Sequence, residues 1–319
     1  MITVDNQTLQ QNVQDKQNIF GVPLTLQIFP KIRIRKLDIV MESNGFKSFY
    51  ILFISFYLMN ISAVKNNFMR FSITIKMEKG DETFENVDNE NKSRDPIEAQ
   101  KDPSFYTDAA AYWEKVPPTV NGVLGGFEKI SSTDIVGSDS FLRGIFRMKN
   151  APSRERVVDC GAGIGRITKN LLVRYFNKVD LVEQCRQFIE KSRETLRSSN
   201  KIGNYYCLGL QDFTPNSNFY DIVWVQWVLG HLNDEDLEGI FSNDLIPGLK
   251  PNGVIVVKEN LSGSGEVELD EEDSSVARPE SLLLKIFDRA GLKVIKNVLQ
   301  RNFPKGLYEV RMFCLKPKT

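Results

Sequence analysis

Apolar residues recur with two different periods along the second half of the chain, and each period predicts a different secondary structure. Residues 157–160 are two β-branched valines followed by Asp and Cys, which is typical of the end of a buried strand. Ile167, Leu171 and Tyr175 then recur at four-residue spacing, which places them on one face of a helix. The pattern therefore predicts a strand and a helix joined by a short turn.

Three glycines spaced two residues apart, Gly161, Gly163 and Gly165, occupy this predicted turn. Glycine has no Cβ, so it permits tight backbone dihedrals and the close approach of a ligand. The spacing differs from the G-x-G-x-x-G of dinucleotide-binding folds and, with Asp159, resembles the D-x-G-x-G-x-G motif of S-adenosylmethionine-dependent methyltransferases. Glu183 ends the next strand-like run about 20 residues later, where a carboxylate can accept from both ribose hydroxyls. Turn and acid together favour a nucleoside-containing ligand; the alternative is that Glu183 is a solvated strand end.

Strand and helix patterns alternate through the rest of this region, which indicates a parallel, doubly wound sheet. Near the end of the chain, residues 291–300 and 307–316 are two extended runs that predict a closing antiparallel pair. The fold class that we predict is therefore α/β: a Rossmann-like seven-stranded methyltransferase sheet, mostly parallel with one antiparallel strand, and an N-terminal helical cover. The predicted helices cover residues 105–116, 133–148, 186–199 and 233–246, and the further strands residues 178–183, 204–209, 220–229 and 253–260.

Charge and cysteine content narrow the classes of function. The 319 residues have a net charge of zero, so no global basic field predicts direct nucleic-acid binding. The charge is uneven, because residues 1–76 carry nine basic and four acidic side chains, whereas residues 77–102 carry four basic and nine acidic ones. The four cysteines are scattered without metal-ligand spacing, so we predict a reduced intracellular protein that holds no metal.

The N-terminal third predicts no folded domain. Residues 1–76 are a basic extension that we expect to be poorly ordered, and residues 77–103 form an acidic, nearly apolar-free stretch typical of a disordered linker. Residues 48–64 form an uncharged segment whose length is at the lower limit for a membrane span. Membrane attachment through this segment is therefore the alternative interpretation. Met77 is a plausible start of the working protein. We place the catalytic domain at residues 104–319.

Six stretches make the resemblance to known enzymes more specific. "AYWEKVPPTVNGVLGGF", "DCGAGIGRITKNLL", "GLQDFTP", "VQWVLGHL", "KPNGVIVVKEN" and "DEEDSSVARP" resemble the protein α-N-terminal methyltransferases. The likeness extends from residue 104 to about residue 316. It implies methyl transfer from S-adenosylmethionine to the free α-amine of proteins that begin X-Pro-Lys or X-Pro-Arg, in the cytoplasm and nucleus.

The resemblance also implies which residues hold the cofactor. Gly161 and Arg166 would flank the methionine end, where the Arg166 guanidinium would pair with its carboxylate. Leu210 and Gln211 would border the adenine, although Leu210 could instead be plain packing. Gln226 would lie below the sulfonium.

The ribose side contains a departure from the family. Glu183, Gln184 and Cys185 would hold the ribose and adenosine, but the family is expected to have Asp in place of Glu183. A carboxylate that is one methylene longer can accept the same hydrogen bonds, so we expect the role to be kept. Cofactor affinity is the property that the change puts in question.

The reaction itself requires a base. An α-amine has a pKa near 7.7–8, so a large fraction is protonated at neutral pH and cannot attack a methyl group. The single histidine, His231, follows a predicted strand at the edge where doubly wound folds bind ligands. The resemblance implies that Asp273, in the acidic run at residues 270–273, faces the amine and that His231 acts as its co-base, so that the two deprotonate or orient the amine for in-line attack. Without the resemblance, His231 would be a capping or packing residue and the acidic run a solvated loop.

The remaining residues implied by the resemblance would bind the peptide. Asp270 would meet the basic third residue of the substrate, Asn260 would hydrogen-bond its backbone, and Ser275 would support the acidic loop. Trp113 and Trp227 have aromatic faces suited to a proline ring, although buried tryptophans are commonly core residues.

Two other functions fit the same sheet. One is a small-molecule or lipid methyltransferase anchored by residues 48–64, and the other is an inactive adaptor that binds protein N-termini. The acidic run argues against a neutral small substrate, which would not need four carboxylates. The intact Gly161, Glu183, Asn260 and Asp273 argue against an inactive adaptor.

Overall fold

The computed structural model describes residues 38–40, 72–74 and 94–318, and the chain divides into two compact units, residues 1–90 and 91–319. In the first unit, the short strands β1 (Asp38–Val40) and β2 (Ser72–Thr74) pair in parallel. The predicted hydrophobic segment 48–64 lies outside the described residues. No helix in the described part of the chain is long and apolar enough to cross a membrane.

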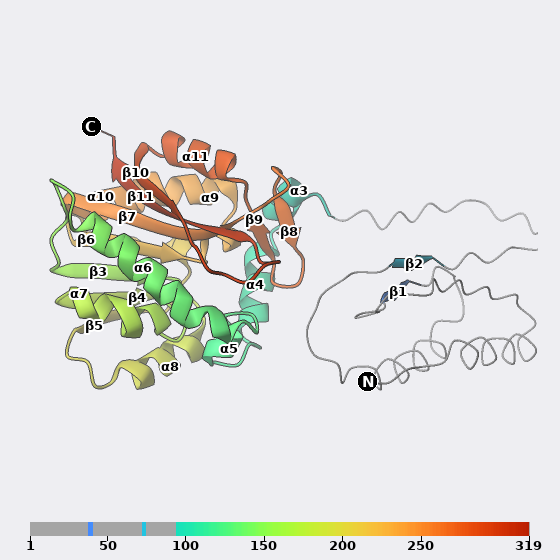
Figure 1. Ribbon diagram of the computed structural model, residues 1–319, viewed down its shortest axis with the longest axis horizontal. Coiled ribbons are helices and arrows are strands. Elements are labelled where there is room, and N and C mark those ends of the chain that lie inside the picture. The colour runs from blue at the N-terminus through green and yellow to red at the C-terminus, as the bar shows by residue number, and fades with distance from the viewer. Residues whose placement is uncertain (1–37, 41–71, 75–93, 319) are drawn as a thin grey trace, which may run out of the picture. The chain divides into compact units, whose positions relative to one another are not determined.

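The second unit is built on one seven-stranded sheet with the order β10-β11-β7-β6-β3-β4-β5 (Figure 1). The run from β7 to β5 is parallel, and β11 is antiparallel to both of its neighbours. The predicted sheet with one antiparallel strand is therefore confirmed. Its strands are β3 (Arg156–Cys160), β4 (Lys178–Val182), β5 (Ile202–Tyr206), β6 (Tyr220–Gln226), β7 (Leu249–Leu261), β10 (Leu292–Leu299) and β11 (Glu309–Pro317).

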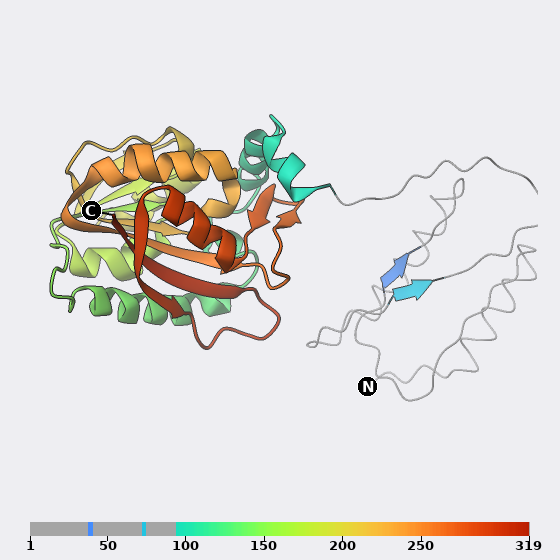
Figure 2. The ribbon, with the colours of Figure 1, turned by 90° about the horizontal axis from the view of Figure 1, so that it is seen from above.

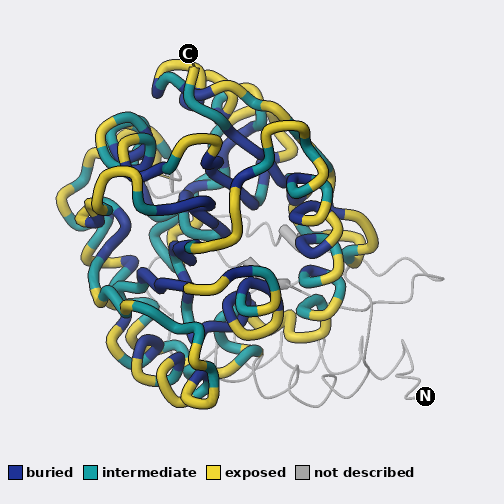
Figure 3. Tube along the Cα trace, turned by 90° about the vertical axis from the view of Figure 1, so that its left-hand side faces the viewer, coloured by how far each residue is buried: buried dark blue, intermediate teal, exposed yellow. Residues whose placement is uncertain are grey.

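Alternate residues of the central strands pack on opposite faces of the sheet. Val223 and Val225 of β6 belong to one apolar cluster, whereas Ile222 and Trp224 belong to the other. Because both faces are covered, these strands are buried along their length, as Figure 3 shows for the interior of the molecule. This arrangement explains the continuous apolar runs in the sequence.

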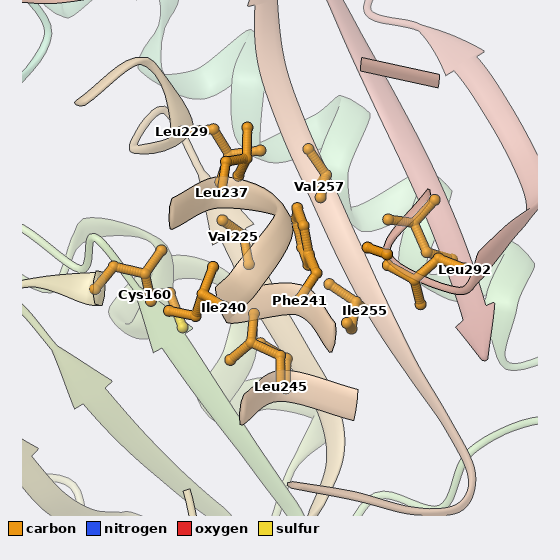
Figure 4. Packing of buried hydrophobic residues seen from close by; sticks show 14 of the residues in the cluster. Cys160, Val225, Leu229, Leu237, Ile240, Phe241, Leu245, Ile255, Val257 and Leu292 are labelled. Carbon is orange, nitrogen blue, oxygen red and sulfur yellow. The ribbon is translucent and has the colours of Figure 1, made fainter. Parts of the chain in front are cut away.

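Helices cover both faces of the sheet, as the view from above shows (Figure 2). In the first cluster, Leu237, Ile240 and Phe241 lie over Val225 and Val257 of the sheet (Figure 4). The helical elements of that face are α9 (Asp234–Gly239), the π-helix η5 (Ile240–Leu245), α10 (Ile246–Gly248) and α11 (Glu280–Arg289). Those that pack on the other face are α6 (Ser131–Ile145), the π-helix η2 (Thr168–Leu172), α7 (Val173–Tyr175) and α8 (Arg186–Leu196).

A cover of short elements lies at one end of the sheet. The hairpin of β8 (Glu268–Asp270) and β9 (Ser275–Ala277) carries the acidic run at its tip, and it lies beside the N-terminal helices (Figure 1). This hairpin and α11 are absent from the sequence prediction, whereas the predicted helical cover is present. The N-terminal elements are α3 (Pro96–Lys101), α4 (Phe105–Trp113), α5 (Val120–Val123) and the 3-10 helix η1 (Glu128–Ile130).

The folded region begins earlier than the predicted boundary at residue 104. Asp95 accepts a hydrogen bond from the backbone N–H of Ile97 at 2.7 Å and caps α3, whose first residue is a proline. The side chain of Gln100 accepts from Arg278, which holds α3 on the catalytic unit. Residues 94–103 of the predicted linker are therefore part of the fold, and residues 77–93 lie outside the described residues. Within α3 only Ala99 and Gln100 are buried. Because so few positions need apolar side chains, the composition of this helix resembles that of a linker.

Candidate active site

The glycine turn lies between β3 and the helical segment that starts at Arg166. Gly161, Gly163 and Gly165 all have positive φ angles, of +71°, +55° and +76°. A Cβ on Gly161 would lie 2.7 Å from the Cβ of Val228, so this position excludes a side chain through both its dihedral and its surroundings. The turn therefore exposes backbone at the carboxyl end of β3, beside the point where the strand order reverses.

Glu183 follows β4 and binds the glycine turn directly. One carboxylate oxygen accepts from the backbone N–H of Gly163 and the other from that of Cys185, both at 2.8 Å. Burial raises the pKa of Glu183, while these N–H donors lower it. A carboxylate has about four acceptor positions, so Glu183 retains capacity for two ligand hydroxyls.

The turn and the strand ends surround a central pocket with about 980 Å³ of empty space, including its opening to solvent. The volume and the mixed polar and apolar lining are suited to a nucleoside-containing ligand. Most predicted site residues line it: Trp113, Gly161, Arg166, Glu183, Gln184, Leu210, Gln211, Gln226, Trp227 and His231.

Five predicted residues lie outside that lining: Cys185, Asn260, Asp270, Asp273 and Ser275. Cys185 is buried, and its Sγ lies 3.8 Å from the carbonyl oxygen of Trp113. Asn260 is half-buried near the end of β7, whereas Asp270 is exposed on the acidic hairpin. The roles that the resemblance implies for these residues stay predictions.

The acidic hairpin holds Asp273 close to His231. The hydroxyl of Ser275 donates to a carboxylate oxygen of Asp273 at 2.6 Å. Burial raises the pKa of Asp273, and the donor Ser275 and the nearby His231 oppose that shift. Ser275, which was predicted to support the acidic loop, therefore contacts Asp273 of that loop.

Trp113 fixes the protonation pattern of His231. Its indole N–H donates to Nε2 of His231 at 3.0 Å, so Nε2 is an acceptor and the neutral ring carries its proton on Nδ1. Burial lowers the pKa of His231, and Asp273 opposes that shift through its charge. Nδ1 is buried and has no hydrogen-bond partner among the described residues, and the same holds for Nε1 of Trp227. Nε1 of Trp227, in the lining of the pocket, is therefore available to a ligand, whereas the backbone of Ser274 lies beside the His231 ring and raises its pKa.

Two further residues, Tyr106 and Asp159, shape the pocket but were not among the predicted site residues. Tyr106 lines it and holds the cover closed, since its hydroxyl bonds Asp236 and accepts from the backbone N–H of Asn233. Asp159 also lines it, and burial raises its pKa to about 7 even though it accepts two hydrogen bonds from Thr168. The motif spacing identified Asp159 as part of the turn, but Tyr106 is one tyrosine of nine.

Metal ligation finds no support in this part of the molecule. Among the described residues, no group of three His, Cys, Asp or Glu side chains could hold a metal ion. The site offers hydrogen-bond acceptors at Glu183, a cation at Arg166 and aromatic faces at Trp113 and Trp227. This donor set fits a nucleoside joined to an amino acid, which is the chemical structure of S-adenosylmethionine.

Known proteins are similar to this chain in sequence and in fold. The profile of the family described as AdoMet-dependent proline di-methyltransferase matches residues 101–316. An N-terminal Xaa-Pro-Lys N-methyltransferase 1-A from Xenopus laevis is 43% identical over 215 residues, which are 66% of this chain and 95% of the relative. An alpha N-terminal protein methyltransferase 1 from Drosophila melanogaster is 46% identical over 223 residues, which are 69% of this chain and 79% of the relative.

Solved structures agree with the sequence matches. A SAM-dependent methyltransferase from Leishmania major has a TM-score of 0.63 and 35% identity, over 68% of this chain and 86% of that one. A phosphoethanolamine N-methyltransferase 1 from Haemonchus contortus, at a TM-score of 0.54 and 20% identity over 70% of this chain and 50% of that one, shares the fold. The predicted methyltransferase class and its cofactor, S-adenosylmethionine, are thereby confirmed. The chain belongs to the family of AdoMet-dependent proline di-methyltransferases.

Proposed function

We propose that this enzyme methylates the free α-amino group of protein N-termini that begin X-Pro-Lys or X-Pro-Arg. One observation carries the proposal: His231, which lines the pocket beside Trp113, lies close to Asp273 on the acidic hairpin. An N-terminus that begins X-Pro-Lys or X-Pro-Arg presents an ammonium group, a proline ring and a basic side chain. The site offers a matching partner for each of these three groups. The relatives named for Xaa-Pro-Lys N-methylation support the same substrate.

The cofactor residues divide between the two ends of the pocket. Glu183, Gln184 and Cys185 hold the ribose and adenosine, and Leu210 and Gln211 border the adenine. Gly161, Arg166 and Gln226 hold the methionine end. When bound, S-adenosylmethionine supplies an electrophilic methyl group on its sulfonium.

Asp273 and His231 prepare the amine. The Asp273 carboxylate takes a proton from the substrate ammonium, which frees the nitrogen lone pair. His231 positions the peptide beside that carboxylate: burial favours its neutral ring and Nε2 accepts from Trp113, so its Nδ1–H can donate to a neighbouring acceptor but cannot take the ammonium proton. The neutral ring also avoids placing a second cation next to the ammonium.

The rest of the peptide is recognised around that centre. Trp113 and Trp227 flank the proline ring, Asn260 hydrogen-bonds the backbone, and Ser275 holds the acidic hairpin through Asp273. The exposed Asp270 pairs with the side chain of the third residue. Because this pair is open to solvent, it contributes to recognition and is screened by salt.

The test is a methylation assay on N-terminal peptides followed by mass spectrometry. We expect transfer to an X-Pro-Lys peptide and none to the same peptide with an acetylated α-amine, whose terminal nitrogen is an amide and no longer a nucleophile. The variant Asp270→Asn should raise KM for X-Pro-Lys but have little effect on a peptide with a neutral third residue. The exposed Glu271→Gln, one residue away, is the matched control. Methylation of small amines or lipids in place of peptides would contradict the proposal.

The cofactor assignment makes a separate prediction. The variant Glu183→Ala should weaken S-adenosylmethionine binding by roughly 1.5–3 kcal/mol, because it removes a charged acceptor that also holds Gly163 of the glycine turn. Calorimetry of the purified variants measures this loss directly. Glu190→Ala, on the exposed face of α8, is the control that should bind normally. Unchanged affinity in Glu183→Ala would remove the ribose assignment.

A further inference from the structure

Asp134 of α6 is a fully buried carboxylate that contacts two side chains of the cofactor site. One oxygen accepts from Nη1 of Arg166 at 2.7 Å. The other accepts from the amide of Gln226 at 3.0 Å and lies 2.5 Å from Nζ of Lys258. Arg166 and Gln226 line the central pocket, whereas Asp134 and Lys258 do not. One carboxylate therefore connects α6 to the start of the helix after β3, the end of β6 and β7.

Lys258 anchors this carboxylate from the side away from the pocket. Its ammonium is fully buried and donates to the hydroxyl of Ser138 at 3.0 Å and to the amide oxygen of Gln300 at 2.7 Å. It also donates to the backbone carbonyl of Asp134 at 3.2 Å. Burial lowers the pKa of Lys258, and the charge of Asp134 opposes that shift. The position of Asp134 is thus set by groups that would not touch a ligand.

Arg166 depends on Asp134 for its orientation. An arginine side chain has many rotamers, and holding one of them requires fixed partners. Among the described side chains, Arg166 donates to Asp134 and, at the longer distance of 3.4 Å, to the hydroxyl of Ser131. Asp159 also lies close enough to Arg166 for their charges to interact, but no hydrogen bond joins these two side chains, so Asp134 is the carboxylate that holds the guanidinium.

We infer that Asp134 is a positioning residue of the cofactor site, which holds the guanidinium of Arg166 and the amide of Gln226 toward the methionine end of S-adenosylmethionine. The inference rests on the assignment of Arg166 to the methionine carboxylate in the proposed function. Asp134 acts through these two side chains and does not touch the cofactor.

The test compares two ligands that differ in the amino-acid end. S-adenosylhomocysteine carries the carboxylate that Arg166 would meet, whereas 5′-methylthioadenosine keeps the nucleoside and the thioether without that end. In the full-length chain, Asp134→Asn should weaken S-adenosylhomocysteine binding about 10-fold or more, the loss expected for charge-assisted hydrogen bonds. Binding of 5′-methylthioadenosine should stay near the wild-type value. Calorimetry of both ligands on each variant gives the ratio.

A matched control separates positioning from general destabilisation. Asp180 is another fully buried carboxylate, paired with Arg156 at 2.8 Å and outside the lining of the pocket. Asp180→Asn should lower thermal stability but leave the ratio of the two affinities unchanged. Equal weakening of both ligands by Asp134→Asn, or the same change of ratio in Asp180→Asn, would overturn the inference.

Two further variants keep the test decisive. Asp134→Asn leaves buried cations without their partner, so the double variant Asp134→Asn/Lys258→Met removes one of them and should fold. It should keep the selective loss of S-adenosylhomocysteine; a normal ratio would show that Asp134 balances charge without orienting Arg166. Arg166→Met should itself lose S-adenosylhomocysteine selectively. If it does not, the assignment of Arg166 and this inference fail together; if it does and Asp134→Asn does not, the inference alone fails.

Discussion

The variant Asp273→Asn should lower kcat for an X-Pro-Lys peptide by about 100- to 10,000-fold, the usual loss when a general base is removed. The amide has nearly the shape of the carboxylate and can still accept from Ser275, so the hairpin should keep its form. The amide cannot take a proton from the substrate ammonium. The effect should therefore fall on kcat more than on cofactor binding.

The pH dependence of the loss identifies its cause. The α-amine of a peptide has a pKa near 7.7–8, so above about pH 9 most of the substrate arrives without the extra proton. The deficit of Asp273→Asn relative to the wild type should therefore shrink as the pH rises from 7 to 9.5. A variant that is impaired only because its hairpin is distorted would show the same deficit throughout.

The neighbouring Glu272 provides the control. It is exposed on the same hairpin, one residue from Asp273, so Glu272→Gln should leave kcat near the wild-type value at every pH. Initial rates at saturating peptide and cofactor measure both variants. If Asp273→Asn also keeps its kcat at pH 7, the proton leaves by another route, and the role assigned to Asp273 is wrong.

The sheet was predictable because its signals are local. The valines of β3 and the run from Val254 to Val257 are β-branched and apolar on both faces, and such runs are typical of strands covered by helices on both sides. The glycine turn is local too, since its spacing and the positive φ angles that it permits occur within five residues. The structure confirms both the seven-stranded, mostly parallel sheet and its closing antiparallel pair.

Other local signals misled the prediction at element ends. The run "YDIVWVQWVL" suggests a strand to residue 229, but β6 ends at Gln226. Trp227 has a φ of +53°, so the chain turns there and carries the indole into the wall of the pocket. Nothing in an apolar run indicates where such a turn occurs. Trp227, which departs from the strand, is one of the residues to which the resemblance gives a role in substrate binding.

Buried polar contacts were not predictable, because their partners are far apart in the sequence. Lys258 meets Asp134 across 124 residues, and Arg278 meets Gln100 across 178. Glu259 is similar, since it accepts from the backbone N–H of Leu229, and burial raises its pKa to about 7. In the sequence, Lys258, Glu259 and Arg278 are each one of 82 charged residues. The fold must be known before these charges can be assigned to the site.

Arg278 makes the second prediction with a large effect, on stability. Its guanidinium is buried and donates to the carbonyl oxygens of Leu229 at 2.9 Å and Leu232 at 2.6 Å, which flank His231. It also donates to the carboxylate of Asp234 at 2.7 Å and to Gln100 of α3 at 3.0 Å. The Arg278 side chain thus joins the turn that holds His231, α9 and the N-terminal cover. The backbone carbonyl of Arg278 accepts from the backbone N–H of Ser262, beside the acidic hairpin.

The variant Arg278→Met should lower the free energy of unfolding by about 3–5 kcal/mol, because it leaves buried carbonyls and a carboxylate without their donor. Arg289→Met is the control. Arg289 pairs with Glu238 at 2.6 Å, but the two side chains are 49% and 35% exposed, so its loss should cost no more than about 1 kcal/mol. Urea unfolding of both variants at pH 7 measures the difference.

A third variant tests the geometry of Arg278 apart from its charge. Arg278→Lys keeps the cation but has a single nitrogen in place of the planar fork, so it cannot reach Leu229, Leu232, Asp234 and Gln100 together. It should be less stable than the wild type and more stable than Arg278→Met. Its kcat should also fall, since the turn that holds His231 loses carbonyl contacts on both sides. Wild-type stability and kcat in Arg278→Lys would show that a buried charge alone suffices, and that the forked contacts do not set the position of His231.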